Sequence, residues 1–348
     1  MEILQDYSYQ ELTKIILDLG EKSYRAGQIY RALSNGLKIS EITEISKTLR
    51  EKLLAKYYDE PVKLYKKFVS VDGTEKYLFS LYDGNVVEGV YMKNNYGNTQ
   101  CLSTQIGCRM GCVFCASGIG GLVRNLSSGE MFATTCLVNR LGGGNVNKRA
   151  VTNIVLMGSG EPFDNYDNTI KYLRCISSKE GLNVSLRNIS LSTSGLVPQI
   201  YKFSEENLPL NLTISLHNPF TSERAKLMPI TKAYSVEEIL KACEHYFNKT
   251  GRRYIFEYSL VKGENDSKKC ADELVRILKG RPCHVNIIRL NEVKENSLKR
   301  TTEKETYAFC GYLEKNGLSA TVRRLNGADI EGACGQLRRS VINNQNNN

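Results

Sequence analysis

The sequence contains no tryptophan, and it has only 7 prolines and 3 histidines among its 348 residues. No stretch approaches the roughly 18 uninterrupted apolar residues of a membrane-spanning helix, so we expect no membrane partner. The first six residues, MEILQD, lack the basic start and the apolar core of a signal peptide. We therefore expect a cytoplasmic protein whose 11 cysteines serve as thiols, metal ligands or catalytic groups, not as a disulfide framework.

A strong excess of one charge is also missing. Lys and Arg number 47 against 37 Asp and Glu, which gives a modest net charge of +10. A solvated basic surface accounts most simply for this balance. If basic clusters share one face, however, they would neutralise phosphates and make nucleic-acid binding dependent on salt. The 20 tyrosines could stack on bases, so composition leaves nucleic-acid binding open.

Four cysteines in one short stretch carry the strongest chemical signal. Cys101 is followed by Cys108, Cys112 and Cys115, and these last three have the spacing C-x3-C-x2-C. Three thiolates can bind three irons of a [4Fe-4S] cubane and leave the fourth iron open to another molecule. The spacing therefore favours a cluster that takes part in chemistry, not one that only stores electrons.

Cysteines at this spacing could also serve other purposes. Structural zinc needs four closed ligands, usually as two pairs, and the gap between Cys101 and the triplet fits no common zinc pattern. Two-cluster ferredoxins use C-x2-C-x2-C and need a further cysteine nearby. Three unrelated buried thiols are the remaining possibility. We favour the iron–sulfur cluster.

The first hundred residues show two different periodicities. Residues 1–60 have helical spacing, with a capping box at Ser8 and Glu11, and predict a helical accessory domain whose basic third helix contacts RNA. Residues 61–98 hold three strand patterns separated by two Asp-Gly turns. Asp-Gly between such patterns is typical of hairpins, so a small antiparallel β extension is expected here.

Strand and helix patterns then alternate from residue 99 to residue 325. Alternation of this kind predicts an α/β fold with a parallel sheet, either open or closed into a barrel. A C-terminal segment covers 326–340, and the polar tail at 341–348 is expected to be disordered. The predicted strands of the core are Thr99–Ser103, Asn153–Met157, Asn188–Ser192, Asn211–Leu216, Arg253–Leu260 and His284–Arg289.

Polar residues follow several of these strands, where parallel sheets bind their ligands. Glu161, after the second strand, could accept a hydrogen bond from an ammonium group. The hydroxyl-rich end of the third strand suits a carboxylate or a ribose, and an amide after the sixth could read a ribose or a base. The candidate residues at these strand ends are Gly160, Glu161, Ser192, Ser215, Leu216, His217 and Asn291.

The cysteine triplet after a first strand, with a Gly-Glu-Pro turn after the second, resembles the radical S-adenosylmethionine (SAM) superfamily. The resemblance becomes closer in the segments 101–108, 123–126, 215–217, 228–230 and 329–337, which are similar to the RlmN/Cfr family of RNA adenine methyltransferases. It implies a partial (β/α)6 barrel and a [4Fe-4S] cluster bound by Cys108, Cys112 and Cys115. It also implies two SAM molecules per turnover, contacted by the strand-end residues named above.

The same resemblance implies roles for three residues outside the cluster. Cys334, in the 326–340 segment, takes a methyl group from one SAM, and a radical derived from a second SAM removes a hydrogen from that methyl. The resulting carbon radical adds to adenine and links protein to RNA. Glu88, which local sequence alone presents as a solvated charge on a strand, then removes the ring proton. Cys101 attacks the sulfur of Cys334, which releases the product and leaves a Cys101–Cys334 disulfide.

The family has two branches, which differ in the adenine carbon that they methylate. RlmN-like enzymes act at C2 in 23S rRNA and in tRNA, whereas Cfr-like enzymes act at C8 of the rRNA and confer antibiotic resistance. Segments 121–125, 250–253 and 322–324 look RlmN-like, although 287–291 looks closer to Cfr and no proline follows Asn291. We favour C2.

Further partners follow from the same resemblance. An electron donor such as flavodoxin or ferredoxin is expected, and the chain is expected to be a monomer. A different class of protein also stays open, namely a non-catalytic RNA-binding protein with a structural metal staple.

Overall fold

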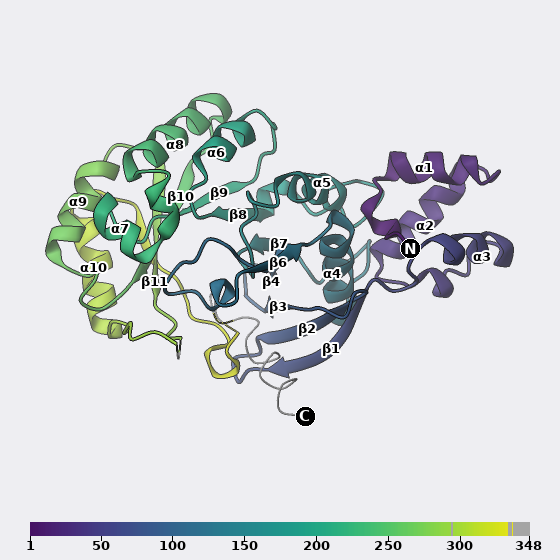
Figure 1. Cartoon of the computed structure of the whole chain (residues 1–348), viewed down its shortest axis with the longest axis horizontal. Coiled ribbons are helices and arrows are strands. Elements are labelled where there is room, and N and C mark those ends of the chain that lie inside the picture. The colour runs from purple at the N-terminus through teal and green to yellow at the C-terminus, as the bar shows by residue number, and fades with distance from the viewer. Residues whose placement is uncertain (294, 333–335, 337–348) are drawn as a thin grey trace.

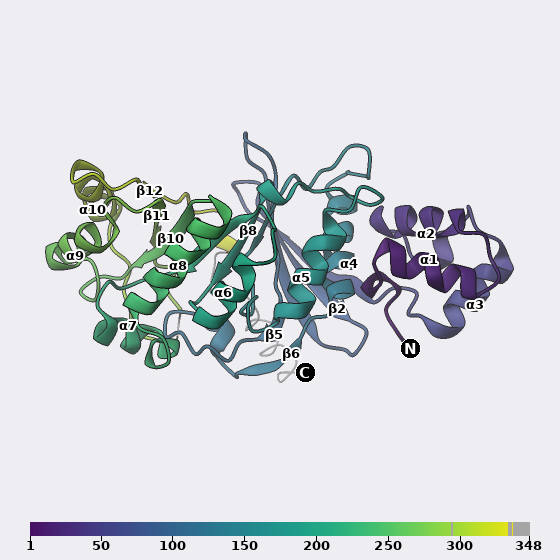
Figure 2. The same ribbon diagram turned by 90° about the horizontal axis from the view of Figure 1, so that it is seen from above.

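One continuous sheet organises the fold (Figures 1 and 2). The computed structural model describes residues 1–293, 295–332 and 336, and within them ten strands pair in the order β1-β2-β3-β4-β7-β8-β9-β10-β11-β12. The first three strands, β1 (Val62–Val69), β2 (Glu75–Leu81) and β3 (Val86–Met92), are antiparallel. The parallel strands are β4 (Thr99–Cys101), β7 (Asn153–Leu156), β8 (Ile189–Thr193), β9 (Asn211–Ser215), β10 (Tyr254–Leu260), β11 (Cys283–Arg289) and β12 (Ala320–Val322).

The predicted α/β class is confirmed, and two details of the sheet go beyond the prediction. The antiparallel extension is not a separate sheet, because β3 pairs with β4 and places Val90 opposite Cys101. The parallel part also gains β12, a strand of three residues that is too short to show a period. A small hairpin of β5 (Gln105–Gly107) and β6 (Leu122–Asn125), also unpredicted, flanks the cysteine loop.

Helices lie along the parallel sheet and at one end of the molecule. The N-terminal helices α1 (Tyr9–Asp18), α2 (Tyr24–Ser34) and α3 (Lys47–Lys56) lie at the end opposite to α9 and α10 (Figure 1). The predicted capping box of α1 is present, since the Ser8 hydroxyl accepts from the Glu11 amide and the Glu11 carboxylate accepts from the Ser8 amide. The other helices are α4 (Ser128–Leu141), α5 (Tyr166–Ile176), α6 (Val197–Ser204), α7 (Thr221–Leu227), α8 (Val236–Thr250), α9 (Lys268–Leu278) and α10 (Glu303–Lys315).

A single hydrophobic cluster extends from the N-terminal helices through α4 and α5 into the parallel sheet. None of the described helices combines the length and the apolar character needed to cross a membrane. Each N-terminal helix turns its apolar face inward. The side chains on these faces, Leu12, Ile29, Leu49 and Leu53, have no measurable exposure.

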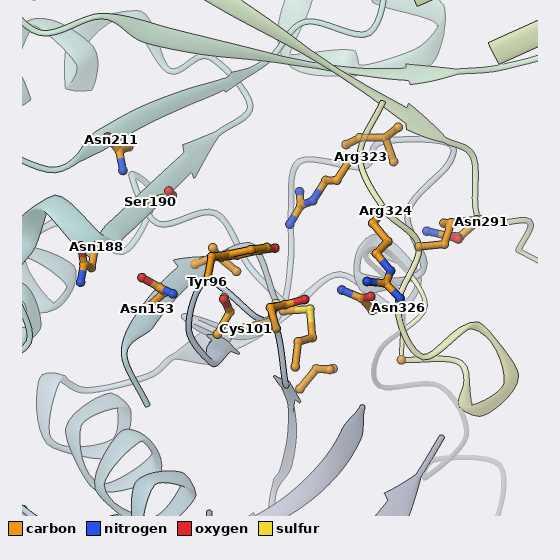
Figure 3. Close-up of a pocket in the computed structure, with 18 of the residues that line it drawn as sticks. Tyr96, Cys101, Asn153, Asn188, Ser190, Asn211, Asn291, Arg323, Arg324 and Asn326 are labelled. Atoms are coloured by element: carbon orange, nitrogen blue, oxygen red, sulfur yellow. The ribbon is translucent and has the colours of Figure 1, made fainter. Parts of the chain in front are cut away.

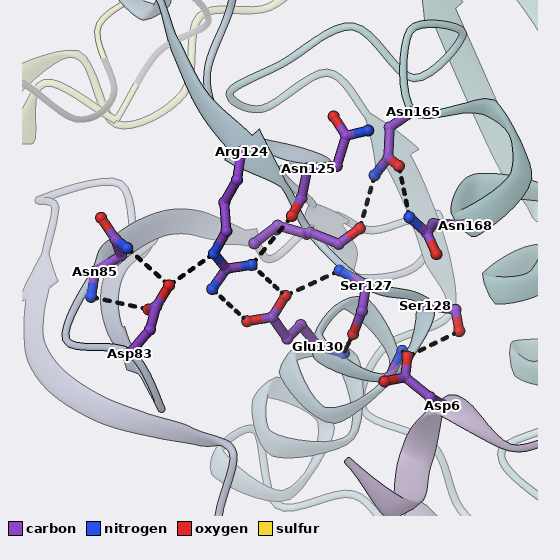
Figure 4. A network of polar contacts seen from close by, with 12 residues as sticks. Asp6, Asp83, Asn85, Arg124, Asn125, Ser127, Ser128, Glu130, Asn165 and Asn168 are labelled. Carbon is purple, nitrogen blue, oxygen red and sulfur yellow. Dashed lines mark hydrogen bonds and ion pairs between the residues drawn. The ribbon is translucent and has the colours of Figure 1, made fainter. Parts of the chain in front are cut away.

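A polar network fixes the N-terminal region and the antiparallel strands to the start of α4 (Figure 4). Arg124 of β6 donates to Asp83, in the turn between β2 and β3, at 2.7 Å and to both oxygens of Glu130 at 2.8 Å. Asp6 accepts from the backbone amide of Gly129 at 2.6 Å. Because Glu130 is fully buried, its two bonds to Arg124 satisfy a carboxylate that would otherwise be costly to bury.

Candidate active site

The three cysteines of the C-x3-C-x2-C motif converge on one cavity of about 160 Å³. Cys108, Cys112 and Cys115 lie in the loop that follows β5, and β6 returns from this loop. Arg109, in the same loop, forms a two-pronged ion pair with Asp164, with Nε–Oδ2 at 2.8 Å and Nη2–Oδ1 at 2.5 Å. This pair ties the cysteine loop to the turn that follows β7.

The chemistry of the three thiols fits a [4Fe-4S] cluster. Among the described residues, no three His, Cys, Asp or Glu side chains are grouped tightly enough to hold one metal ion. A cubane does not need such a group, because each cysteine binds a different iron. Burial raises the pKa of the Cys108 thiol to about 12. The pKa of the Cys112 thiol is also raised, mainly by burial and to a smaller extent by the two neighbouring thiols. A bound cluster would be held by these sulfurs as thiolates, so its binding would favour loss of the thiol protons.

The predicted strand-end residues line the same cavity, with one exception. Gly160, Glu161, Ser192, Ser215, His217 and Asn291 are all in the lining. Leu216 is fully buried and is not part of it, but its backbone carbonyl accepts a hydrogen bond from Arg224 at 2.9 Å. The ends of β7, β8, β9 and β11 therefore gather around the cysteine loop, as the order of strands and helices predicted.

Glu161 presents a buried carboxylate beside this cavity. Its Oε2 accepts from the Ser194 amide at 2.6 Å and its Oε1 from the Phe163 amide at 3.0 Å. Burial raises the pKa of this carboxyl, and the two backbone amides oppose the rise. Gly160, just before it, has a φ of +108°, and a Cβ there would lie 2.6 Å from the Cβ of Gln105, so only glycine fits.

His217 is held in one tautomer. The Ser259 amide donates to its Nδ1 at 2.9 Å, which leaves the proton of the neutral ring on Nε2. Burial, and next the nearby Arg224, lower the pKa of the imidazole to about 3. The ring also meets Phe114 of the cysteine loop edge to face, with 4.7 Å between centroids. His217 is therefore a neutral hydrogen-bond donor that links β9 to the loop.

Arg224 was not predicted, and it organises two of the strand ends. Its guanidinium is fully buried and donates to the carbonyls of Ser194 and Ser215, each at 2.7 Å. Burial lowers its pKa to about 10, which still leaves it charged at neutral pH. The sequence carries no signal for this role, because the carbonyl partners of Arg224 come from other segments of the chain.

A second cavity, of about 330 Å³, adjoins the first. Both are lined by Ile288, Asn291 and Arg323, so the two share a wall. Cys101 lies in the middle of the second cavity with Tyr96, between a row of asparagines on one side and Arg323 and Arg324 on the other (Figure 3). Cys101 is thus separate from the cysteine triplet. The asparagines in this lining are Asn94, Asn153, Asn188, Asn211, Asn291 and Asn326.

Glu88 lies close to Cys101 on the same face of the sheet. The pairing of Val90 with Cys101 and the two-residue period of β3 put Glu88 diagonally across from Cys101. Glu88 is only 2% exposed, and its carboxylate is 3.4 Å from the ammonium of Lys76. The interpretation of Glu88 as a solvated charge, made from local sequence alone, is therefore wrong, because Lys76 and the chain at Glu331 lie over this face of the sheet.

Cys334 and the predicted tail at 341–348 lie outside the described residues. Gly332, two positions before Cys334 in the sequence, lines the second cavity. The described part of the C-terminal segment therefore reaches the cavity that contains Cys101.

Two family models match the chain. The model of the radical SAM superfamily matches residues 102–274, which include the cysteine triplet and most of the parallel sheet. The model described as the ribosomal RNA large subunit methyltransferase N-terminal domain matches residues 3–58, the region of α1 to α3. Fold and site therefore define a radical SAM protein, with a [4Fe-4S] cluster and SAM as its cofactors.

Full-length relatives narrow the family. A probable dual-specificity RNA methyltransferase RlmN from Lachnoclostridium phytofermentans is 49% identical, with 95% of this chain and 92% of that protein covered. A protein of the same name from Lachnospira eligens is 46% identical, with coverages of 98% and 97%. A radical SAM methyltransferase from Sphaerobacter thermophilus has a solved structure with a TM-score of 0.93, 39% identity and coverages of 97% and 99%. The chain belongs to the RlmN family.

Proposed function

We propose that this protein methylates C2 of adenine in 23S rRNA and in tRNA. The observation that carries the proposal is the shared wall between the cavity of the cysteine triplet and the cavity that contains Cys101, beside Glu88. The cluster, bound by Cys108, Cys112 and Cys115, supplies with SAM the carbon-centred oxidant that removes a hydrogen atom. Gly160, Glu161, Ser192, Ser215, Leu216, His217 and Asn291 bind and orient SAM.

The residues at the second cavity then complete the methyl transfer. Cys334 carries the methyl carbon, which becomes bonded to the adenine ring. The Glu88 carboxylate takes the proton from the ring carbon. The Cys101 thiolate attacks the sulfur of Cys334, and a disulfide forms as the C–S bond breaks. The electron pair of that bond stays on the carbon, which takes up a proton and becomes the methyl group of the product. The unpaired electron left on the adduct by the radical addition would return to the oxidised cluster.

The size and the lining of the second cavity support a nucleotide as its occupant. Arg187, Arg323 and Arg324 can meet phosphates, and Tyr96, which is 81% exposed, offers a ring for stacking. We assign residues 1–60 to RNA binding, 61–98 to the β extension, 99–325 to the barrel and 326–340 to the methyl-carrying segment. A monomer in the cytoplasm, reduced by flavodoxin or ferredoxin, completes the proposal.

Nucleoside analysis of ribosomal RNA and tRNA from cells with and without the gene tests the reaction. We expect 2-methyladenosine in both RNAs only when the gene is present, and its loss when Cys108→Ala replaces the natural gene. 8-Methyladenosine in its place would assign the chain to C8 chemistry. RNA binding without any methylated nucleoside would favour the non-catalytic protein with a metal staple.

A further inference from the structure

Lys76 is a buried cation that the mechanism above does not use. It lies on β2 and is only 2% exposed, so it cannot contact RNA from the surface. A lysine is rarely buried to this degree unless it has partners. Within the part of the chain that the structure describes, its ammonium contacts the Glu88 carboxylate at 3.4 Å and the backbone carbonyl of Glu331 at 3.3 Å.

The register of the sheet explains why Lys76 meets Glu88. β2 and β3 are antiparallel, with Leu78 opposite Glu88 and Lys76 opposite Val90. Side chains alternate between the two faces, so Lys76, Glu88 and Val90 share one face and Lys76 is the diagonal neighbour of Glu88. Cys101, opposite Val90 on β4, lies on the same face. The cation is therefore built into the surface that carries both Glu88 and Cys101.

The second partner of Lys76 belongs to the C-terminal segment. Glu331 precedes Cys334 by three residues in the sequence. The turn between β1 and β2 holds the same segment at two more points. The Asp72 carboxylate accepts from the Gly327 amide at 2.9 Å, and the Asp329 carboxylate accepts from the Ser70 hydroxyl at 2.5 Å. Lys76 thus lies between the proposed base and an anchored stretch of the chain that leads to Cys334.

We propose that Lys76 is a positioning residue for the release step: its ammonium fixes the Glu88 carboxylate and, through the Glu331 carbonyl, the chain that leads to Cys334. This inference rests on the proposed function. Lys76 does not touch the reacting atoms. Its ammonium lies 3.4 Å from the Glu88 carboxylate and 3.3 Å from the Glu331 carbonyl, so it holds these two groups at a fixed separation.

The test measures the covalent protein–RNA adduct that precedes release. Lys76→Met removes the charge, Lys76→Gln also removes it but keeps a hydrogen-bond donor, and Lys76→Arg keeps the charge. Lys93→Met is the matched control, because Lys93 also pairs with a glutamate of this sheet, but with Glu75, at 2.9 Å. Each protein is loaded with its cluster, reacted with SAM, tRNA and a low-potential reductant under anaerobic conditions, quenched and run on a denaturing gel. Thermal unfolding is recorded in parallel.

We expect Lys76→Met and Lys76→Gln to form methylated Cys334, which peptide mass spectrometry detects. Both variants should accumulate about tenfold more adduct than the natural chain. This effect is smaller than the usual 10²–10⁴-fold effect of a general base, because Lys76 only positions the base. Lys76→Arg should restore most of the release, and Lys93→Met should resemble the natural chain. Lys76→Met combined with Glu88→Gln should accumulate no more adduct than Glu88→Gln alone, because one variant acts through the other residue.

Two results would overturn the inference, and they differ from failure of the proposed function. Release at the natural rate in both neutral variants would remove Lys76 from the step. An equal slowing in Lys76→Arg and Lys76→Met, in proportion to lost thermal stability, would leave only a structural role. If Lys76→Met does not fold, Lys76→Gln and Lys76→Arg carry the same comparison. A natural chain that methylates no RNA would instead refute the proposed function itself.

Discussion

The two cavities share a wall but differ in the residues that line them. The cavity of the cysteine triplet is lined by sulfur, hydroxyl and carboxylate groups that follow the carboxyl ends of the parallel strands. The second cavity is lined by amides and guanidinium groups, and Asn153, Asn188 and Asn211 lie at the amino ends of β7, β8 and β9. It has about twice the volume, 330 Å³ against 160 Å³.

This difference in lining fits a division of roles between the two cavities. Strand ends with short polar side chains suit a small cofactor, whose every atom can be contacted. A wider cavity rich in amide groups, with three arginines in its lining, suits one nucleotide of a long polyanion. Ile288, Asn291 and Arg323 line both cavities, so they lie where the cofactor and the nucleotide would meet.

Loss of a proposed cluster ligand should have the largest effect on activity, because it removes the chemistry of the first cavity. Cys108→Ala should lower bound iron from about four per chain to a small remainder and abolish methylation, because the chemistry of the first cavity requires the metal. Iron analysis after anaerobic reconstitution is the measurement. Cys310→Ala, which removes a buried thiol from α10, is the control and should retain full iron. Full iron in Cys108→Ala would refute the ligand assignment.

Loss of Cys101 should block the chemistry of the second cavity and leave the cluster of the first cavity intact. Cys101→Ala should bind iron normally, yet its methylated product should fall by about 10²–10³-fold and the protein–RNA adduct should accumulate, because no thiolate remains to attack Cys334. A denaturing gel with labelled tRNA measures the adduct. Cys175→Ala, which removes another buried thiol, serves as the control. A variant that turns over without adduct would contradict the release role.

The neutral His217 should make stability depend on pH. Its pKa in the folded chain, about 3, lies below the ordinary value of 6.5. Its contribution to stability is therefore complete above pH 6.5 and is lost as the pH falls toward 3, by at most about 1.4 kcal/mol per pH unit. Urea unfolding between pH 7 and pH 5 measures the slope.

His217→Asn is the matched variant, because asparagine tolerates the left-handed backbone of this position, where φ is +54°. It should flatten the slope and weaken SAM binding without changing RNA binding. An unchanged slope would show that another group titrates in this range.

The asparagines of the second cavity should have the smallest effect. Asn188→Ala should raise the KM for tRNA by about two- to tenfold, the equivalent of one hydrogen bond, and leave SAM affinity unchanged. Steady-state kinetics with tRNA, together with SAM binding by calorimetry, measures both quantities. If SAM affinity falls as much as RNA affinity, the two cavities do not divide substrate and cofactor as proposed.

Much of the first cavity could be predicted because its residues either are close in sequence or lie at the carboxyl ends of strands in the repeating strand–helix unit. The cysteine triplet lies within eight residues, and Glu161, Ser192, His217 and Asn291 each lie at or just after the end of a strand. Parallel strands bring their carboxyl ends to one edge, so the pattern of strands and helices is enough to gather these side chains. β12 and the β5–β6 hairpin escaped prediction because three- and four-residue strands show no clear period.

The sequence by itself determined the α/β class, and it indicated that the cysteine triplet and the strand-end residues meet at one site, because these follow from local spacing and from a fixed rule of strand direction. Only the tertiary structure decided that Glu88 is buried, that Lys76 and Arg224 find their partners, and that Cys101 belongs to a second cavity. These facts depend on which strands pair and in which register, and on contacts between segments as far as 255 residues apart, as for Lys76 and Glu331. Local sequence carries no record of such distant contacts.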